Sequence, residues 1–92
     1  MADELVVGTV VGVIDQPGAR APSLLLTLDL GSYGIVEAVV PVGGQDTPDL
    51  AGRQLLVRRE DDGVVVVGAH SHAKGLVLLA PEQNVEPGTL VS

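Results

Sequence analysis

The residues that could carry out chemistry are few, and they do not form a catalytic or metal-binding set. His70 and His72 could offer two imidazoles to a metal, but a zinc site needs further ligands and the chain has no Cys. Glu60-Asp61-Asp62 gathers carboxylates without the alternating spacing or framing glycine of a calcium loop. No serine lies in a G-x-S-x-G turn. We therefore expect a non-enzymatic protein with no cofactor and no metal, in which the histidines lie in an exposed loop and the carboxylates at a hairpin tip.

Cationic side chains are the next candidates, because they could bind the phosphates of a nucleic acid. The 92 residues include 12 acidic and five basic ones, for a net charge of −7, which argues against a broad phosphate-binding surface. Arginine can nevertheless bind phosphate bidentately and stack on bases, so a local site remains open. Its candidates are Arg20, Arg53, Arg58, Arg59, Lys74 and the single aromatic residue, Tyr33. Tyr33 fits equally well as a turn residue packed over the rim of a barrel.

The elements that must position these side chains are short β-strands. The chain is 46% hydrophobic and rich in β-branched valine, which favours pleated strands. One stretch alternates clearly, with Leu24, Leu26, Leu28 and Leu30 on one face. The expected strands are Leu5–Ile14, Ser23–Leu30, Ile35–Val40, Gln54–Arg59, Gly63–Gly68, Leu76–Ala80 and Thr89–Val91.

Turn residues separate these strands. Gly31–Gly34 predicts a tight turn, and Asp62-Gly63 predicts a hairpin. Thr47–Gly52 has a Thr cap, a following Pro and a final Gly, which predict one short helical turn. Gly43–Asp46 is expected to be an exposed loop, and Pro81–Gly88 to be irregular.

Many short strands in so small a chain favour a closed barrel, because closure removes exposed sheet edges. We expect residues 1–92 to form a single all-β domain. Its predicted architecture is a five-stranded Greek-key OB-fold barrel with short additional C-terminal strands and at most one short helical turn.

Several short motifs also follow one another in a characteristic order along the chain. They are V-G-T-V-V at 7–11, P-x-A-R-x-P at 17–22, L-T-L-D-L-G at 26–31, and the segments 34–36, 47–55, 64–69, 76–81 and 85–89. This series resembles the tRNA-binding-domain family of the CsaA type, which also occurs fused to methionyl- and phenylalanyl-tRNA synthetases. Other small β-barrels, such as the vertex proteins of bacterial microcompartments, share the composition but explain the proline motifs less well.

The acidic start at Met1–Glu4 and the lack of an apolar run near the roughly 20 residues that span a bilayer predict a soluble cytoplasmic protein that interacts with no membrane. The resemblance implies a non-catalytic binding module. Binding of tRNA or other structured RNA, through the cations and Tyr33 named above, is the favoured hypothesis. The alternative is a CsaA-like chaperone that binds unfolded or exported polypeptide on an apolar strand, with Val36, Val39 and Val40 as contacts. A third hypothesis is a self-assembling structural barrel that has lost RNA binding.

The chain departs from the family pattern at sites that bear on both hypotheses. Residues 36–41 are apolar and acidic where relatives carry a polar, often basic stretch. An asparagine-proline-arginine loop between the fourth and fifth strands is missing, because Arg59 runs directly into the acidic triplet. The homodimer implied by the resemblance would also lack the N-terminal interface helix that relatives place before the first strand.

Overall fold

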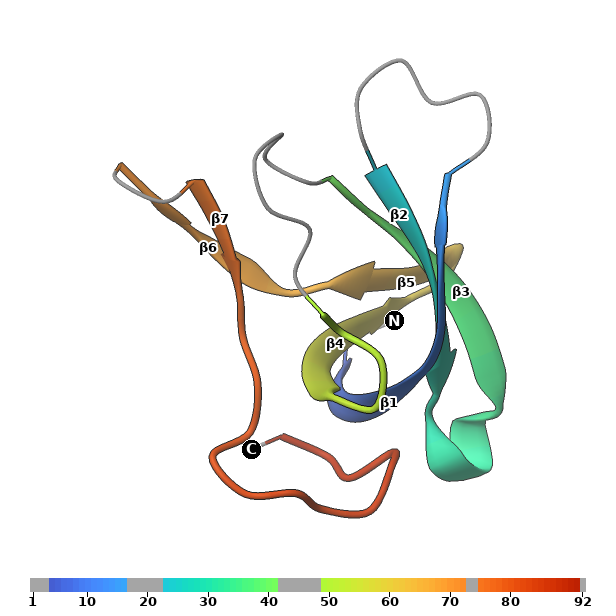
Figure 1. The fold of residues 1–92 in the computed structure, drawn as a ribbon. Coiled ribbons are helices and arrows are strands. Elements are labelled where there is room, and N and C mark those ends of the chain that lie inside the picture. Colours follow the sequence, from blue (N-terminus) through green and yellow to red (C-terminus); the bar gives the residue numbers. More distant parts are fainter. Residues whose placement is uncertain (1–3, 17–22, 42–48, 73–74, 92) are drawn as a thin grey trace.

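Five strands form one curled antiparallel sheet in the order β3-β2-β1-β4-β5 (Figure 1). The computed structural model describes residues 4–16, 23–41, 49–72 and 75–91. The strands are β1 (Glu4–Asp15), β2 (Ser23–Asp29), β3 (Ile35–Pro41), β4 (Gln54–Glu60) and β5 (Gly63–Val66). The sheet curls until β3 approaches β5, giving a nearly closed five-stranded barrel. The predicted all-β OB-fold architecture is confirmed.

The curvature of the sheet depends on the long strand β1. Its first half pairs with β4 and its second half with β2, so one strand belongs to both sides of the barrel. The register with β2 shifts between Val10 and Gly12, which leaves Val11 as the extra residue of a β-bulge. A bulge increases local twist and bends its strand. The bulge therefore lies where β1 passes from one partner strand to the other.

Alternating apolar side chains fill the barrel. All four leucines predicted to share one face of β2 are buried, together with residues from the neighbouring strands and from the turn before β4. Each buried leucine or valine contributes about 1.5–3 kcal/mol through removal of apolar surface from water. The core cluster comprises Val6, Val10, Leu24, Leu26, Leu28, Leu30, Ala38, Val40, Leu50, Leu55 and Val57.

A second, two-stranded sheet extends from the barrel, and it corrects one prediction. Strands β6 (Gly68–Ser71) and β7 (Gly75–Leu78) pair antiparallel and project away from the barrel (Figure 1). The segment with His70 was predicted to be a loop, but it forms β6. The sequence does not indicate the strand that begins at Gly68, because its small and polar residues show no hydrophobic periodicity.

The helical and C-terminal predictions hold in part. The described helix is the 3-10 turn η1 (Gly31–Tyr33), where a tight turn was expected. The loop predicted at 43–46 lies outside the described residues, as do residues 47–48 of the helical turn predicted at 47–52. The described remainder of that segment is a turn, in which Arg53 N–H bonds to Leu50 O. The strand predicted at Thr89–Val91 is wrong, because only one bridge, between Val6 and Leu90, forms there.

The C-terminal segment covers one edge of β1. Val7 donates a hydrogen bond to Thr89 O at 2.9 Å and accepts one from Gly88 N–H at 2.7 Å. Val91 N–H bonds in turn to Leu5 O at 2.8 Å. Since β2 pairs only with the second half of β1, this segment satisfies backbone groups of the first half that would otherwise be unpaired.

Two glycines allow this segment to approach so closely. Gly31 and Gly88 both have positive φ, of 65° and 86°. A Cβ on Gly31 would overlap the Pro87 carbonyl oxygen, and a Cβ on Gly88 would overlap the Leu30 carbonyl oxygen. Glycine is therefore required at both positions by conformation and by space.

Candidate binding surfaces

The arginines proposed to bind RNA are distributed over the barrel and do not converge. Arg58 and Arg59 are neighbours on β4, so their side chains leave opposite faces of the sheet. Arg53 is exposed just before β4, about 20 Å from Arg59 at roughly 3.3 Å per residue. Arg20 and Lys74 lie outside the described residues. The described cations therefore form no continuous basic patch.

Both arginines of β4 also have acidic partners. Arg58 Nη2 lies 2.8 Å from Glu60 Oε2, and Arg59 Nη1 lies 2.6 Å from Glu4 Oε1. These groups are about one third to one half exposed, and such pairs contribute about 0–1 kcal/mol to stability. A phosphate that binds either of these guanidinium groups in this geometry would have to displace the carboxylate already in place.

Among the RNA candidates that the structure describes, Tyr33 and Arg59 are brought together from different elements. The Arg59 guanidinium carbon lies 3.9 Å from the centre of the Tyr33 ring, a cation–π contact between η1 and β4. Tyr33 is half-buried and packs against the core cluster. The stack joins η1 to β4, and the packing of Tyr33 against the core fits its interpretation as a turn residue.

The three valines proposed for polypeptide binding differ in exposure because β3 alternates. Val40 is 3% exposed and belongs to the core, and Val36 is half-buried against it. Val39 is 52% exposed and points outward. Of the three, only Val39 offers most of a side chain to a partner.

An apolar row crosses the outer face at Val39, and sequence reasoning did not find it. Ile14 on β1 pairs with Leu25 on β2, and Leu25 pairs with Val39 on β3. Ile14 is 57% exposed, and Leu25 is half-buried. We call Ile14, Leu25 and Val39 the outer apolar row. Strand register alone places these three side chains together, and no local sequence signal marks their pairing.

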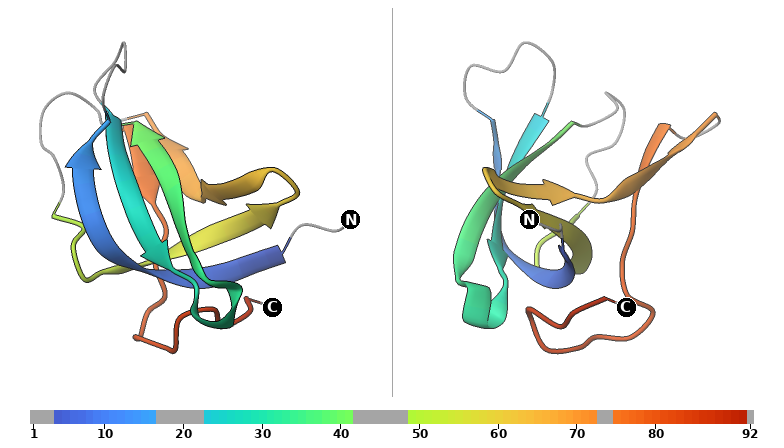
Figure 2. Two further views of the ribbon diagram at one scale, coloured as in Figure 1. Left: turned by 90° about the vertical axis from the view of Figure 1, so that its right-hand side faces the viewer. Right: turned by 180° about the vertical axis from the view of Figure 1, so that it is seen from behind.

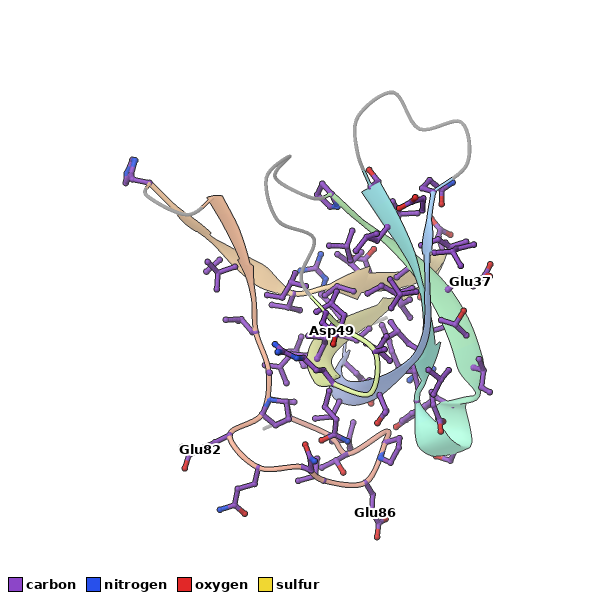
Figure 3. The ribbon with its side chains drawn as sticks, in the orientation of Figure 1. Glu37, Asp49, Glu82 and Glu86 are labelled. Atoms are coloured by element: carbon purple, nitrogen blue, oxygen red, sulfur yellow. The ribbon has the colours of Figure 1, made fainter. Side chains whose placement is uncertain are left out.

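This outer face is open and has an acidic border. Figure 2 (left) looks onto β1, β2 and β3, and no other described strand crosses in front of them. Glu37 lies two residues before Val39 on the same face of β3, and its side chain points away from the barrel (Figure 3). Asp29, four residues after Leu25, lies on the same face of β2. The surface thus combines an apolar centre with negative charge.

One buried polar residue holds the C-terminal segment and takes no part in these surfaces. Gln54 is 8% exposed; its amide nitrogen donates to Val85 O at 2.6 Å and to Thr9 Oγ1 at 3.1 Å. Val85 N–H donates back to Gln54 Oε1 at 2.9 Å. The side-chain amide of Gln54 thus takes the place of a backbone hydrogen-bond partner for Val85, so the role of Gln54 is to hold the C-terminal segment in position.

The described residues contain no group of three or more His, Asp or Glu side chains arranged to hold a metal ion. His72 is exposed at the β6–β7 turn, and Asp61 and Asp62 form the exposed β4–β5 turn as predicted. No helix in the described part of the chain is long and apolar enough to span a membrane.

The chain is similar in structure to two CsaA chaperones. The crystal structure of the chaperone CsaA from Bacillus anthracis str. Ames is 27% identical, with a TM-score of 0.87 over 98% of this chain and 91% of that one. The CsaA chaperone protein from Picrophilus torridus is 21% identical, with a TM-score of 0.84 over 98% of this chain and 92% of that one. No protein-family model and no curated protein sequence matches the chain.

Proposed function

We propose that this barrel is a non-catalytic polypeptide-binding protein that holds apolar stretches of extended chains on the outer face of β1, β2 and β3. The observation that carries the proposal is the outer apolar row. Ile14, Leu25 and Val39 form a contiguous apolar strip, with Thr27 and Glu37 beside it on β2 and β3. Contiguous exposed apolar surface with a polar rim is typical of interaction sites.

Two further facts support a polypeptide over a nucleic acid as the ligand. The net charge of −7 and the carboxylates bordering the outer apolar row repel phosphate. The similar structures from Bacillus anthracis and Picrophilus torridus are both named chaperones. An acidic border favours clients with an apolar stretch and nearby basic residues.

The test is binding to a permanently unfolded protein, for which reduced and carbamidomethylated lysozyme is a suitable basic probe. We expect Val39→Lys to weaken binding at least about fivefold, because it places a solvated ammonium in the apolar strip. Val91→Lys is the matched control, since Val91 is also exposed but lies in the C-terminal segment. Fluorescence anisotropy measures both variants, and circular dichroism checks that each folds. Equal affinity of Val39→Lys and Val91→Lys would count against this surface.

Binding of tRNA or structured RNA is the second candidate, and the Tyr33–Arg59 pair favours it. An aromatic ring beside a guanidinium offers the stacking and cationic contacts with which OB-folds bind nucleic acids. A mobility-shift titration with bulk tRNA at low and moderate salt tests it. We expect a salt-sensitive shift that Arg59→Ala weakens if this function holds; absence of any shift at low salt would eliminate it.

A further inference from the structure

We infer that two copies of this chain associate through an apolar face of the β6–β7 hairpin. The inference goes beyond the proposed function and does not rest on it, because the hairpin lies apart from β1, β2 and β3 (Figures 1 and 2). Three properties of the hairpin point to this partner: its attachment to the barrel, its exposed apolar side chains and its lack of carboxylates.

The hairpin is held at its base and projects from the barrel. Leu56 on β4 donates its N–H to Leu79 O at 2.9 Å and accepts a hydrogen bond from Val67 N–H at 2.9 Å. Beyond this base, β6 and β7 pair with each other and with no other described strand. A two-stranded hairpin by itself is marginally stable in water. Packing against a further layer would therefore stabilise it.

Strand register puts four apolar side chains on one face of the hairpin. Ala69 pairs with Val77, and the bond from Leu79 N–H to Val67 O at 3.2 Å continues the ladder, so Val67 and Leu79 lie on the same face two residues away. Val77 is 40% exposed, Leu79 is 37% exposed, and Ala69 is also exposed. The opposite face is turned to the barrel, because Leu78 packs against the core. We call Val67, Ala69, Val77 and Leu79 the hairpin apolar face.

The hairpin is free of carboxylates although the chain is acidic. Residues 63–81 include no Asp or Glu and form the longest stretch of the sequence without one, so all 12 acidic residues lie elsewhere. Figure 3 shows Glu37 on the other side of the barrel, and Glu82 and Glu86 on the C-terminal segment away from the hairpin. At the β5 end, Glu60 is already paired with Arg58 at 2.8 Å. The hairpin apolar face thus lies in the least acidic part of the chain.

This distribution of charge favours a second copy as the partner. Two chains of net charge −7 repel each other, and the repulsion is smallest when the carboxylates lie far from the contact. The centres of protein interfaces are likewise depleted of charged residues. A basic client would find opposite charge at Glu37 instead. A nucleic acid would need several cations, and residues 63–81 include one Lys.

The contact has a defined symmetry. Because the same face meets itself, the interface is isologous and closes as a dimer. The two hairpins would form layers packed about 10 Å apart, with the apolar side chains between them. The outer apolar rows lie away from this contact, so the dimer displays that surface twice.

Sedimentation equilibrium of the purified chain measures the association. Val77→Lys places an ammonium on the hairpin apolar face. Val85→Lys is the matched control, because Val85 is 39% exposed and lies on the C-terminal segment. We expect Val77→Lys to raise the dimer dissociation constant at least about tenfold, since each dimer carries the change twice, and Val85→Lys to stay within about threefold. Circular dichroism checks folding, and Ala69→Lys replaces Val77→Lys if that variant does not fold.

Salt and hydrogen exchange give two further readouts. We expect the dissociation constant to fall as salt rises from about 0.01 M to 1 M, because screening weakens the repulsion between two acidic chains. A contact made by ion pairs would weaken instead. Amide exchange of β6 and β7 should slow as the protein concentration rises, while exchange of η1 should not change.

The opposite results would overturn the inference. A mass of one chain at every concentration reached would refute it, as would a dimer that the hairpin variant and the control affect equally. Assemblies that grow beyond two chains would refute the isologous contact, and weakening by salt would refute a carboxylate-free interface. Binding of unfolded lysozyme tests the proposed function separately, so failure of one proposal is distinguishable from failure of the other.

Discussion

Replacing Gly88 with alanine tests how much stability depends on the glycine that lets the C-terminal segment approach the barrel closely. Gly88 has a φ of 86°, and a Cβ there would overlap the Leu30 carbonyl oxygen. Gly52 provides the matched control, because its φ is 81° and nothing lies within 4 Å of an added Cβ. Both positions have a positive φ that disfavours alanine, and they differ only in whether neighbouring atoms leave room for a Cβ.

The expected losses of unfolding free energy follow from two contributions, the backbone conformation and the steric overlap. An alanine at positive φ costs about 1–2 kcal/mol, so Gly52→Ala should lose that amount of unfolding free energy. Overlap with a backbone oxygen in a packed region adds about 1–3 kcal/mol, so Gly88→Ala should lose about 2–5 kcal/mol. For a domain of this size, 1 kcal/mol corresponds to roughly 4–8 °C in Tm.

Thermal melts followed by circular dichroism give the comparison directly. We expect the Tm of Gly88→Ala to lie at least about 5 °C below that of Gly52→Ala. Amide hydrogen exchange should show the loss concentrated where the segment pairs with β1, at Val7 and Val91. Equal melting temperatures for the two variants would mean that the segment does not contact the barrel as described.

Three further changes test other parts of the structure. Gln54→Leu should cost about 1–3 kcal/mol and speed exchange of the Val85 amide, because the backbone groups of Val85 lose their partner; unchanged exchange there would contradict the contact. Arg59→Ala should cost about 1 kcal/mol in urea unfolding, because it removes both the stack on Tyr33 and an ion pair, and no loss would argue against the stack. Leu26→Ala should cost about 2–5 kcal/mol, because Leu26 is fully buried, and a loss below about 1 kcal/mol would place it outside the core.

Much of the fold could be predicted because its signals are local. The alternating leucines of β2, the Asp-Gly turn before β5 and the glycine-flanked turn before β3 each act within a few residues. Strand β6 could not be predicted, since its residues carry no hydrophobic alternation. The C-terminal strand was predicted from a short β-prone run, but the structure keeps only the bridge to Val6 there.

The candidate surfaces could be predicted only where they lie within one strand. Val39 was selected from the sequence together with Val36 and Val40, and alternation of β3 then left Val39 alone exposed. Ile14 and Leu25 were missed, because they join Val39 through the pairing of three strands. Arg59 was selected as an RNA contact, but its partners, Tyr33 and Glu4, come from distant parts of the chain.

The sequence by itself determined the strand-rich composition, the position of most turns, the core face of β2 and the negative charge that weighs against RNA. Each of these depends on the chemistry of single residues or their immediate neighbours. Tertiary structure alone decided which exposed side chains form one surface and which arginines are already paired. Those properties depend on register and closure of the barrel, and they arise only when strands far apart in the sequence lie side by side.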